Sequence, residues 1–405
     1  MNERNPVSTP VTSIVHFTRD PAQQRYVHAL AKRTYRLRPD GAPEPAPEQL
    51  AIVRESVYYD GDEANPPEWE PDLYACPRGG TDVVVQGTAY CPGGPRRELD
   101  VSVAVQLAGM TRELAFKAAR RIRVYGNRSV RWFAGTISFT DPEPFTTMPL
   151  SYRLAYGGHD HVADFERPDD YAVWMAKSAG DPIFDHSPHG YARNPLGKGY
   201  VVFPSARALE GLALPNLEMA NDLLTPERLV VGNAERWHLA PRPAGFDWHG
   251  EDWFSRTGFL GVSPDFEGTP SDVAEVREGL IPAELLEEDG LFEGLGSSHA
   301  PGFFRAASPW LRLPELTGGE LIHLTHLHPT IAELEVPMPK EAPQMVLELD
   351  GGAARELKAA LRTVVIRPDR GELICVWVGT MPVDGPRTEA QLAKTRHAVR
   401  WKKGT

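Results

Sequence analysis

The chain has 405 residues, of which 41% are hydrophobic and 24% charged, with a formal net charge of -12 at pH 7 and a pI near 5.6. The length allows a sizeable core and two or three domains. The acidic balance argues against an extended nucleic-acid interface, and no apolar run approaches the ~20 residues that span a bilayer. The 36 glycines and 38 prolines predict frequent turns and few long helices. We therefore expect a mainly β protein, with antiparallel sheets or sandwiches, long Pro/Gly-rich loops and few short helices.

The N-terminus and the cysteines indicate a compartment. Residues 1–10 are polar and lack the charged-then-apolar plan of a signal peptide, so we expect a cytoplasmic protein. Cys76, Cys91 and Cys375 are odd in number and have no metal-like spacing. In a reducing compartment all three are expected to be free thiols.

The first third of the chain predicts strands. Residues 11–38 predict a strand, a turn and a second strand, which together form a hairpin. Residues 38–49 contain four prolines, which exclude a central strand or a helix and predict an exposed loop. Residues 81–90 predict a strand around three consecutive valines, and residues 98–107 predict the clearest strand because apolar residues alternate with polar or small ones.

The next segments have weaker patterns. Residues 111–124 have the propensity of a short basic helix, but their β surroundings favour one or two strands. Regular patterning fades over residues 156–310. Within that region only residues 271–289 predict a helix, which Pro282 should split.

Strands return near the end of the chain, separated by Gly, Pro and Asp turns, and they suggest a small antiparallel sheet or sandwich of their own. The basic tail, residues 387–403, is expected to form an exposed helix. We therefore expect an N-terminal β domain (1–155), a loop-rich region with short helices (156–310) and a small C-terminal β domain (311–405). The predicted late strands are residues 320–327, 345–349, 356–366 and 372–378.

Two groups of histidines are candidates for a metal site. On a strand, His326 and His328 would share one face while His323 would point to the other, and no acidic partner has a suitable spacing. The side chains of residues 159–161, His-Asp-His, are neighbours and therefore diverge. We expect no metal and no cofactor, with these residues in structural or surface positions.

Motifs of common catalytic sites are missing from the sequence. It contains no Gly-x-Ser-x-Gly, and neither residues 126–128 nor residues 197–199 have the spacing of a phosphate loop. Lys198, between two glycines, could contact an anion, but a tight turn that exposes the lysine is the favoured interpretation. We expect a protein that is not an enzyme and has no catalytic residues.

A rigid, irregular surface is the first interpretation of residues 123–158, which are rich in aromatic residues, Arg, Pro and Gly. Trp377 lies in an apolar strand and should be core. The tryptophans in polar or turn-rich sequence, Trp174 among them, are either anchors beneath long loops or interface residues. The candidate partner-binding or scaffold residues are Arg128, Trp132, Tyr156, Asn194, Lys198, Trp237, Trp248 and Trp253.

Short motifs occur in a characteristic order along the chain. They are Phe17, Arg19, Asp20, Thr34, Tyr35, Thr81, Asp82, Val83, Gly87, residues 126–128, 144–145 and 148–150, Tyr152, residues 155–158, Asn194, Pro195, Gly197, Gly199, residues 214–216, Gly319 and Glu320. Through these motifs the chain resembles the bacterial family known as domain of unknown function 2169, chiefly over the first 220 residues, with a fainter similarity from residue 300 onward. Asn127 replaces the Asp that is usual in the family, and residues 221–298 follow the pattern least.

The resemblance implies a role in secretion. Genes for similar proteins lie beside those for type VI secretion components, near the VgrG spike, PAAR-like tips and toxic effectors. It therefore implies a non-enzymatic adaptor or chaperone that binds a cognate effector and aids its loading onto the VgrG/PAAR spike, with no nucleic-acid or membrane partner. Under this hypothesis residues 123–158 belong to the common scaffold, and the divergent residues 221–298 select the partner.

A second hypothesis comes from another class of protein. A β-sandwich with Trp and Tyr residues in its loops could bind or process carbohydrate, because aromatic rings stack on sugars. Facing carboxylates across a cleft would favour that hypothesis, whereas an extended aromatic groove would favour protein recognition.

Overall fold

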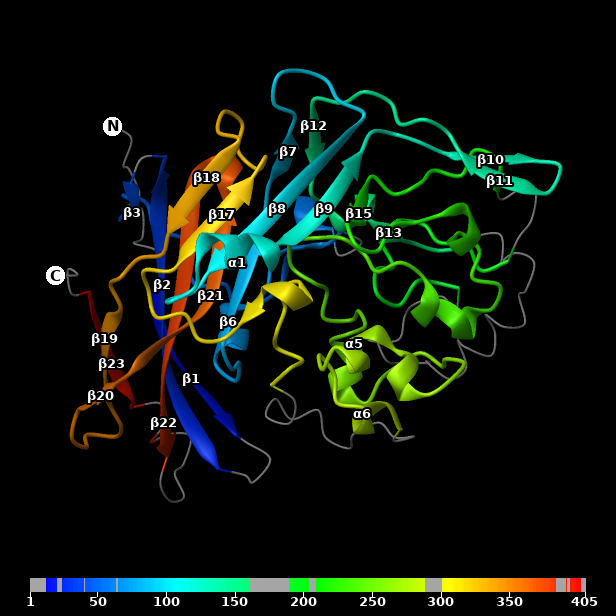
Figure 1. The fold of residues 1–405 in the computed structure, drawn as a ribbon. Coiled ribbons are helices and arrows are strands. Elements are labelled where there is room, and N and C mark those ends of the chain that lie inside the picture. The colour runs from blue at the N-terminus through cyan, green and yellow to red at the C-terminus, as the bar shows by residue number, and fades with distance from the viewer. Residues whose placement is uncertain are drawn as a thin grey trace, which may run out of the picture.

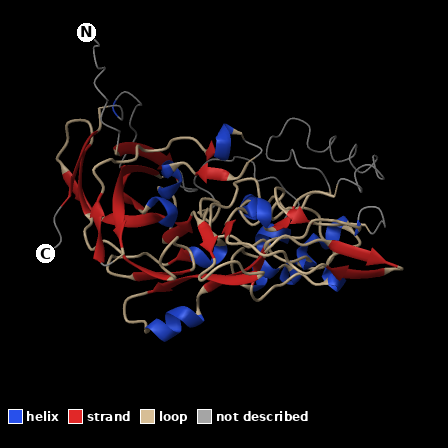
Figure 2. Ribbon diagram, turned by 90° about the horizontal axis from the view of Figure 1, so that it is seen from above, coloured by secondary structure: helices blue, strands red, loops and turns tan. Residues whose placement is uncertain are grey.

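The structure is a computed structural model that describes residues 12–19, 24–39, 41–62, 65–160, 189–203, 209–287, 301–383, 391 and 394–401. Over these ranges the chain forms a seven-stranded, a five-stranded and a three-stranded sheet, together with several two-stranded pairs and short helices (Figures 1 and 2). The predicted mainly β fold class is confirmed. No described helix is long and apolar enough to cross a membrane.

The seven-stranded sheet combines both ends of the chain. Six of its strands follow one another in the order β1 (Ser13–Arg19), β2 (Arg25–Arg38), β22 (Glu372–Val383), β21 (Ala359–Arg367), β6 (Thr81–Val85) and β16 (Arg312–Leu313), and the seventh, β3 (Gly41–Pro45), pairs with β2 outside this order. Strand β2 pairs with β1 on one side and with β22 on the other, and β21 pairs in parallel with β6. The hairpin predicted over residues 11–38 is confirmed by the β1–β2 register.

Two predictions for the N-terminal part need correction. Part of the proline-rich loop predicted over residues 38–49 is a strand, β3 (Gly41–Pro45), which pairs with β2 after a register shift. Proline is tolerated there because β3 lies at an edge. The single strand predicted over residues 81–90 is two: β6 and then β7 (Thr88–Tyr90), which pairs with β12 (Thr147–Pro149).

The five-stranded antiparallel sheet also joins distant parts of the chain. The strand predicted over residues 98–107 is confirmed as β8 (Glu98–Gln106). The prediction of one or two strands over residues 111–124 is partly wrong, because Arg112–Lys117 form a helix, α1, before strand β9 (Arg120–Tyr125). Thr111 caps this helix: its side chain accepts a hydrogen bond from the Leu114 backbone N–H. The strands are β15 (Leu217–Met219), β9 (Arg120–Tyr125), β8 (Glu98–Gln106), β17 (Leu321–Thr325) and β18 (Glu333–Pro337).

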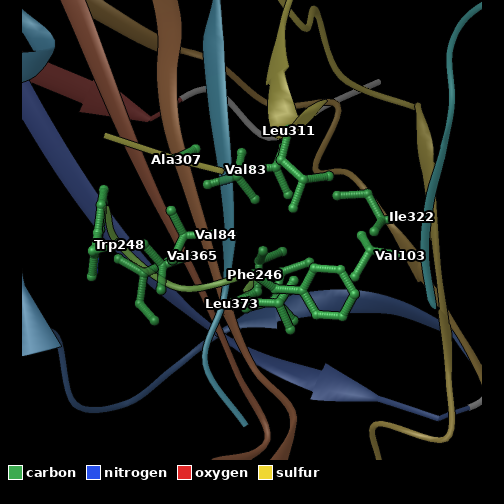
Figure 3. Close-up of a cluster of buried hydrophobic side chains, with 14 of the residues drawn as sticks. Val83, Val84, Val103, Phe246, Trp248, Ala307, Leu311, Ile322, Val365 and Leu373 are labelled. Atoms are coloured by element: carbon green, nitrogen blue, oxygen red, sulfur yellow. The ribbon is translucent and has the colours of Figure 1, made fainter. Parts of the chain in front are cut away.

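The main core includes apolar side chains from both large sheets. In Figure 3, Val83 and Val365 of the seven-stranded sheet lie in the same cluster as Val103 and Ile322 of the five-stranded sheet. Phe246, from the loop-rich region, is fully buried among them. Burial of each such side chain stabilises the fold by about 1.5–3 kcal/mol, so this cluster couples the two sheets.

The small antiparallel sheet predicted for the C-terminal part is confirmed only in part. Three C-terminal strands form a sheet of their own, whereas β17 pairs with β8 and β22 pairs with β2 in the two large sheets. The tail predicted as a helix contains a strand, β23 (Arg396–Trp401), which pairs with β19 (Pro343–Glu348) beside β20 (Arg355–Leu357). The division into three domains stays a prediction, and hydrogen bonding in both large sheets crosses its expected boundaries.

The loop-rich region, which lies beside the two large sheets and ends in the β10–β11 hairpin (Figure 1), is built from short elements around a second core cluster. The helix predicted over residues 271–289 is confirmed as separate short pieces on either side of Pro282, within the part that the structure describes. The elements are β10 (Val130–Phe133), β11 (Thr136–Phe139), β13 (Tyr156–Gly157), β14 (Lys198–Gly199), η5 (Pro226–Arg228), η6 (Ala234–Leu239), η7 (Thr257–Leu260), η8 (Pro270–Asp272), α5 (Ala274–Arg277) and α6 (Glu284–Glu287).

The remaining short elements lie beside the seven-stranded sheet or connect the sheets. They are β4 (Val57–Tyr58), η1 (Tyr59–Gly61), β5 (Pro67–Trp69), η2 (Asp72–Ala75), η3 (Tyr152–Leu154), η9 (Pro309–Leu311) and η10 (Pro368–Arg370). All three cysteines are free.

Candidate binding sites

The structure places three of the candidate tryptophans in the interior. Trp237, Trp248 and Trp253 are each 2% exposed. Trp237 packs against Phe254 with ring centroids 4.8 Å apart, and Trp253 packs against Tyr152 at 5.2 Å. These side chains are anchors beneath loops, which was one of the two interpretations of their sequence context. Trp174 lies outside the described residues.

Tyr156, Asn194 and Lys198 form one connected structural unit. Strands β13 and β14 pair in parallel, so that Tyr156 lies opposite Lys198. The buried Asn194 side chain donates hydrogen bonds to the carbonyl oxygens of Tyr152 and Tyr156, at 2.8 and 3.1 Å. A Cβ atom on Gly157 would lie 2.2 Å from the Asn194 carbonyl oxygen. This close packing assigns the three residues to the scaffold.

Lys198 does not present its ammonium group freely to solvent. Its Nζ donates a hydrogen bond of 2.6 Å to Asn216 Oδ1, and partial burial, together with the charge of Arg128, lowers the pKa of the lysine. Turns precede Lys198, but the residue itself lies in β14 and its side chain contacts a neighbouring loop, so the predicted tight turn with an exposed lysine is wrong.

Arg128 makes a buried ion pair with Glu218 and lies over the Tyr125 ring, with the guanidinium carbon 3.8 Å from the ring centroid. Glu218 also accepts a hydrogen bond from the backbone N–H of Leu224. The pair therefore fixes β15 and the segment after it against the turn that follows β9. Asn127, in the same turn, donates a hydrogen bond to the Glu143 side chain at 3.3 Å.

The β10–β11 hairpin, which contains Trp132, projects at the end of the molecule opposite the two termini (Figure 1). One face of the hairpin packs on the second core through Trp132, Ile137 and Phe139. At the tip, Phe133 is 82% exposed, beside a turn in which Ala134 and Gly135 have φ of 50° and 84°. Sequence reasoning chose Trp132 and missed Phe133, although the alternation of the strand placed the two on opposite faces.

The histidines predicted to share a strand face do not. Strand β17 ends at Thr325, and His326 has φ of 57°, so the alternation stops before His328. His323 is 3% exposed and shares a hydrogen bond of 3.1 Å with Gln106, whereas the His328 ring accepts from the backbone N–H of Thr330. Across the described ranges, no group of three or more His, Cys, Asp or Glu side chains has a geometry that could hold a metal ion.

The second histidine group divides differently. Asp160 is 5% exposed and accepts a hydrogen bond of 2.7 Å from the backbone N–H of Val202, while His159 forms a bridge with Gly190. Asp160 thus anchors a loop and is not part of an exposed polar turn. His161 falls outside the described residues.

A cavity of about 470 Å³, here called the Asp247 pocket, opens beside the end of β6. Five segments that are far apart in the chain form this pocket. They are the loop around β4 and β5, the residues between β6 and β7, the segment from the end of β12 into η3, Asp247, and the segment from Arg367 through η10. Its lining residues are Tyr59, Asp60, Asn65, Pro66, Glu68, Gln86, Gly87, Pro149, Leu150, Ser151, Arg153, Asp247, Arg367, Asp369 and Arg370.

Asp247 is the most buried acid of this pocket, with 4% exposure. Its Oδ1 accepts hydrogen bonds from Gln86 Nε2 at 2.9 Å and from the Trp248 backbone N–H at 2.7 Å, and its Oδ2 accepts one from the Tyr59 hydroxyl at 3.2 Å. Burial raises the pKa of Asp247 to about 7, because desolvation disfavours the charged form. The carboxyl group is therefore poised between its two states near neutral pH.

Arg367 continues this network on the other side of Gln86. Its Nε donates to Gln86 Oε1 at 2.7 Å, and the guanidinium carbon lies 4.7 Å from the centroid of the Trp69 ring. The carboxylates of Glu68 and Glu372 lie 3.7 and 3.9 Å from its terminal nitrogens. Asp247 and Arg367 were not among the candidate residues chosen from the sequence. Asp247 could have been noticed as a carboxylate between two large aromatic residues, Phe246 and Trp248, and Arg367 as a cation at the end of a β-branched run.

A second cavity, of about 480 Å³, is here called the Tyr74 pocket. Its lining includes His16, Arg54, Tyr74 and Glu251. The Tyr74 hydroxyl donates a hydrogen bond of 2.7 Å to Glu251, so the principal carboxylate of this pocket already has a partner.

A comparison with known protein families gives a match. The sequence matches the family described as "Uncharacterized protein conserved in bacteria (DUF2169)" over residues 22–378. Neither the curated proteins nor the solved structures contain a match. The matched range covers most of the chain, including the five-stranded sheet, the hairpin and the Asp247 pocket, and also the seven-stranded sheet except for β1 and the end of β22. The chain therefore belongs to the DUF2169 family.

Proposed function

We propose that this protein is a non-enzymatic adaptor or chaperone that binds a cognate effector in the cytoplasm and aids its loading onto the type VI secretion spike, VgrG or a PAAR-like tip. Membership of the DUF2169 family supports the proposal through the role that the family resemblance implies. Its partners would be proteins, with no nucleic acid or membrane required.

The single observation that carries the proposal is the β10–β11 hairpin. Phe133 is 82% exposed at its tip, the largest exposed fraction among the exposed large apolar side chains of the described residues. Exposure of an aromatic side chain on a projecting element favours contact with another protein, because such residues supply much of the binding energy at interfaces. The hairpin is held firmly, since the Trp132 backbone N–H donates to Glu210 at 2.6 Å.

Partner choice is proposed for residues 221–298, a segment that contains none of the motifs on which the family resemblance rests. Trp237, Trp248 and Trp253 are buried and cannot contact a partner directly. Leu239, at the end of η6, is 49% exposed and is the candidate contact among the described residues of this segment. The hairpin would then supply a general contact and the η6 region a selective one.

Co-purification tests this function. The tagged protein is used to capture the effector and the spike protein encoded beside it, and effector secretion is measured in a deletion strain. Phe133→Ser is expected to weaken capture about tenfold or more, as for an interface hot spot. Leu114→Ser, which changes a 54% exposed residue on α1, is the matched control and should leave capture unchanged.

Leu239→Ser separates the two contact regions. Reduced capture of the cognate effector but not of the spike protein would support selection by the η6 region. Absence of any complex with the neighbouring proteins, combined with normal secretion in the deletion strain, would overturn the proposal.

A further inference from the structure

The Asp247 pocket has the construction of a binding site that the adaptor function does not use. Three of its polar side chains, Gln86, Asp247 and Arg367, are only 4–6% exposed, yet all three line the cavity. They are joined in one chain of hydrogen bonds, from Arg367 Nε through the Gln86 amide to Asp247 Oδ1. Their positions are therefore fixed before any ligand arrives, which lowers the entropic cost of binding.

The network leaves hydrogen-bonding capacity unused on both sides. Within the part of the chain that the structure describes, Asp247 Oδ2 accepts only the Tyr59 hydroxyl, whereas a carboxylate oxygen can accept two hydrogen bonds. On the other side, the carboxylates nearest the terminal nitrogens of Arg367 lie at 3.7 and 3.9 Å, beyond hydrogen-bond length. An acceptor and several donors thus remain open on side chains of the same pocket.

The charges of the lining oppose a strongly charged ligand. Glu68 lies between Arg367 and Arg370, at 3.7 and 3.5 Å, and so offsets both cations. Asp369 accepts hydrogen bonds from two hydroxyls, those of Thr88 and Tyr90. Three arginines and four acids line the cavity, and one of these acids, Asp247, is partly protonated near neutral pH. The formal balance is therefore close to zero.

The remaining walls supply apolar contact. Pro66 and Leu150 are buried, and Pro149 and the Tyr59 ring complete this side of the cavity. Fixed planar polar groups, together with apolar walls, suit a ligand that carries hydroxyl groups on a compact hydrocarbon ring, because each hydroxyl both donates and accepts. An extended peptide instead binds along a groove or a strand edge.

We propose that the Asp247 pocket binds a neutral mono- or disaccharide, with Asp247 accepting from one hydroxyl group of the sugar and Arg367 donating to another. The volume of about 470 Å³ lies within the ~300–1,000 Å³ of small-molecule sites. The proposal is independent of effector binding, since the pocket includes none of the residues of the β10–β11 hairpin or η6.

Saturation-transfer NMR and calorimetry on the full chain test the proposal with maltose, lactose and N,N′-diacetylchitobiose as probes. Asp247→Asn keeps the shape of the side chain but replaces Oδ2, or its hydroxyl when protonated, by an NH₂ group that cannot accept, so affinity should fall about tenfold. Ser151→Trp changes a half-buried rim residue and should block the cavity without altering the buried network. Glu251→Gln, in the Tyr74 pocket, is the control and should bind normally.

Binding of at least one probe that is lost in both pocket variants and kept in the control is the expected result. No binding of any of the three at millimolar concentration would overturn the proposal, as would binding that both pocket variants retain. Glucuronate and tetra-alanine are tested as alternative ligands. If one of these binds and none of the three neutral sugars does, the ligand class is an anion or a peptide and the proposal of a neutral saccharide is overturned. Capture of the effector by the same variants is measured in parallel, so that this proposal and the adaptor function can fail separately.

Discussion

Arg256 and Glu70 form a bidentate ion pair in the interior, with Nη1–Oε1 at 2.9 Å and Nη2–Oε2 at 3.3 Å. The side chains are 0% and 2% exposed. Arg256 also donates hydrogen bonds to the carbonyl oxygens of His249 and Phe303. This one guanidinium group therefore connects the segment after β5 with two loops of the loop-rich region. The pair therefore holds the loop-rich region on the sheet scaffold.

Glu70→Gln should destabilise the protein by about 3–5 kcal/mol, because it leaves the Arg256 charge buried without its partner. Urea unfolding followed by tryptophan fluorescence measures the change. Glu44→Gln removes one partner of the exposed Arg38–Glu44 pair, whose side chains are 51% and 59% exposed, and should cost less than about 1 kcal/mol. Equal effects of the two substitutions would contradict the assigned role of Arg256.

The raised pKa of Asp247 predicts a pH dependence of stability. In the unfolded chain an aspartate titrates near ~3.9, whereas in the folded protein the pKa of Asp247 is about 7. Between these values the folded state binds more protons, so the free energy of unfolding falls as pH rises from about 4 to about 7 and is then constant, a loss of the order of 4 kcal/mol from this group.

Asp247→Asn removes this titration. Its stability relative to the wild type should therefore increase between about pH 5 and about pH 8, as measured by urea unfolding at both values. A difference between the two proteins that does not change with pH would show that Asp247 titrates as it does in the unfolded chain. Glu251→Gln again serves as the control.

Local patterns predicted local structure well. The β1–β2 hairpin, β6 and β8 follow from alternation and from β-branched residues close together in the sequence. Two of the failed predictions also concern local structure. Residues 112–117 have the propensity of a helix, but the prediction favoured strands because the neighbouring segments are strands. The basic tail forms strand β23, in which Trp401 packs on Trp377 with ring centroids 5.2 Å apart.

Long-range pairing could not be predicted. The register between β2 and β22 joins residues about as far apart as the chain permits, and no local pattern encodes such a partner. The Asp247 pocket is similar, because Tyr59 and Asp247 are 188 residues apart. Burial of Trp248 and exposure of Phe133 likewise depend on tertiary packing, since both residues occur in mixed sequence.

The turn of the β10–β11 hairpin predicts two substitutions of opposite sign. Ala134 has φ of 50°, a conformation that costs an L-residue about 1–2 kcal/mol but that Asn tolerates better. Ala134→Asn should therefore stabilise the protein by about 0.5–1 kcal/mol, and Gly135→Ala, at φ of 84°, should destabilise it by about 1 kcal/mol. Thermal unfolding measures both, and the same sign for the two would contradict this turn geometry.

Gly126 offers the sharpest test of the motif that follows β9. A Cβ atom at this position would lie 1.7 Å from the Glu143 carbonyl oxygen and 2.8 Å from its carbon, so the two backbones pack too closely for any side chain. Gly126→Ala must displace the Glu143 backbone, whose N–H donates to the Asn127 carbonyl oxygen at 2.9 Å, and should cost about 3 kcal/mol or more. Gly79→Ala is the matched control, because nothing lies within 4 Å of its Cβ position, and its effect should stay within about 0.5 kcal/mol. Urea unfolding of both variants measures the difference, and a Gly126→Ala protein as stable as the control would mean that the turn and the Glu143 segment do not pack in this way.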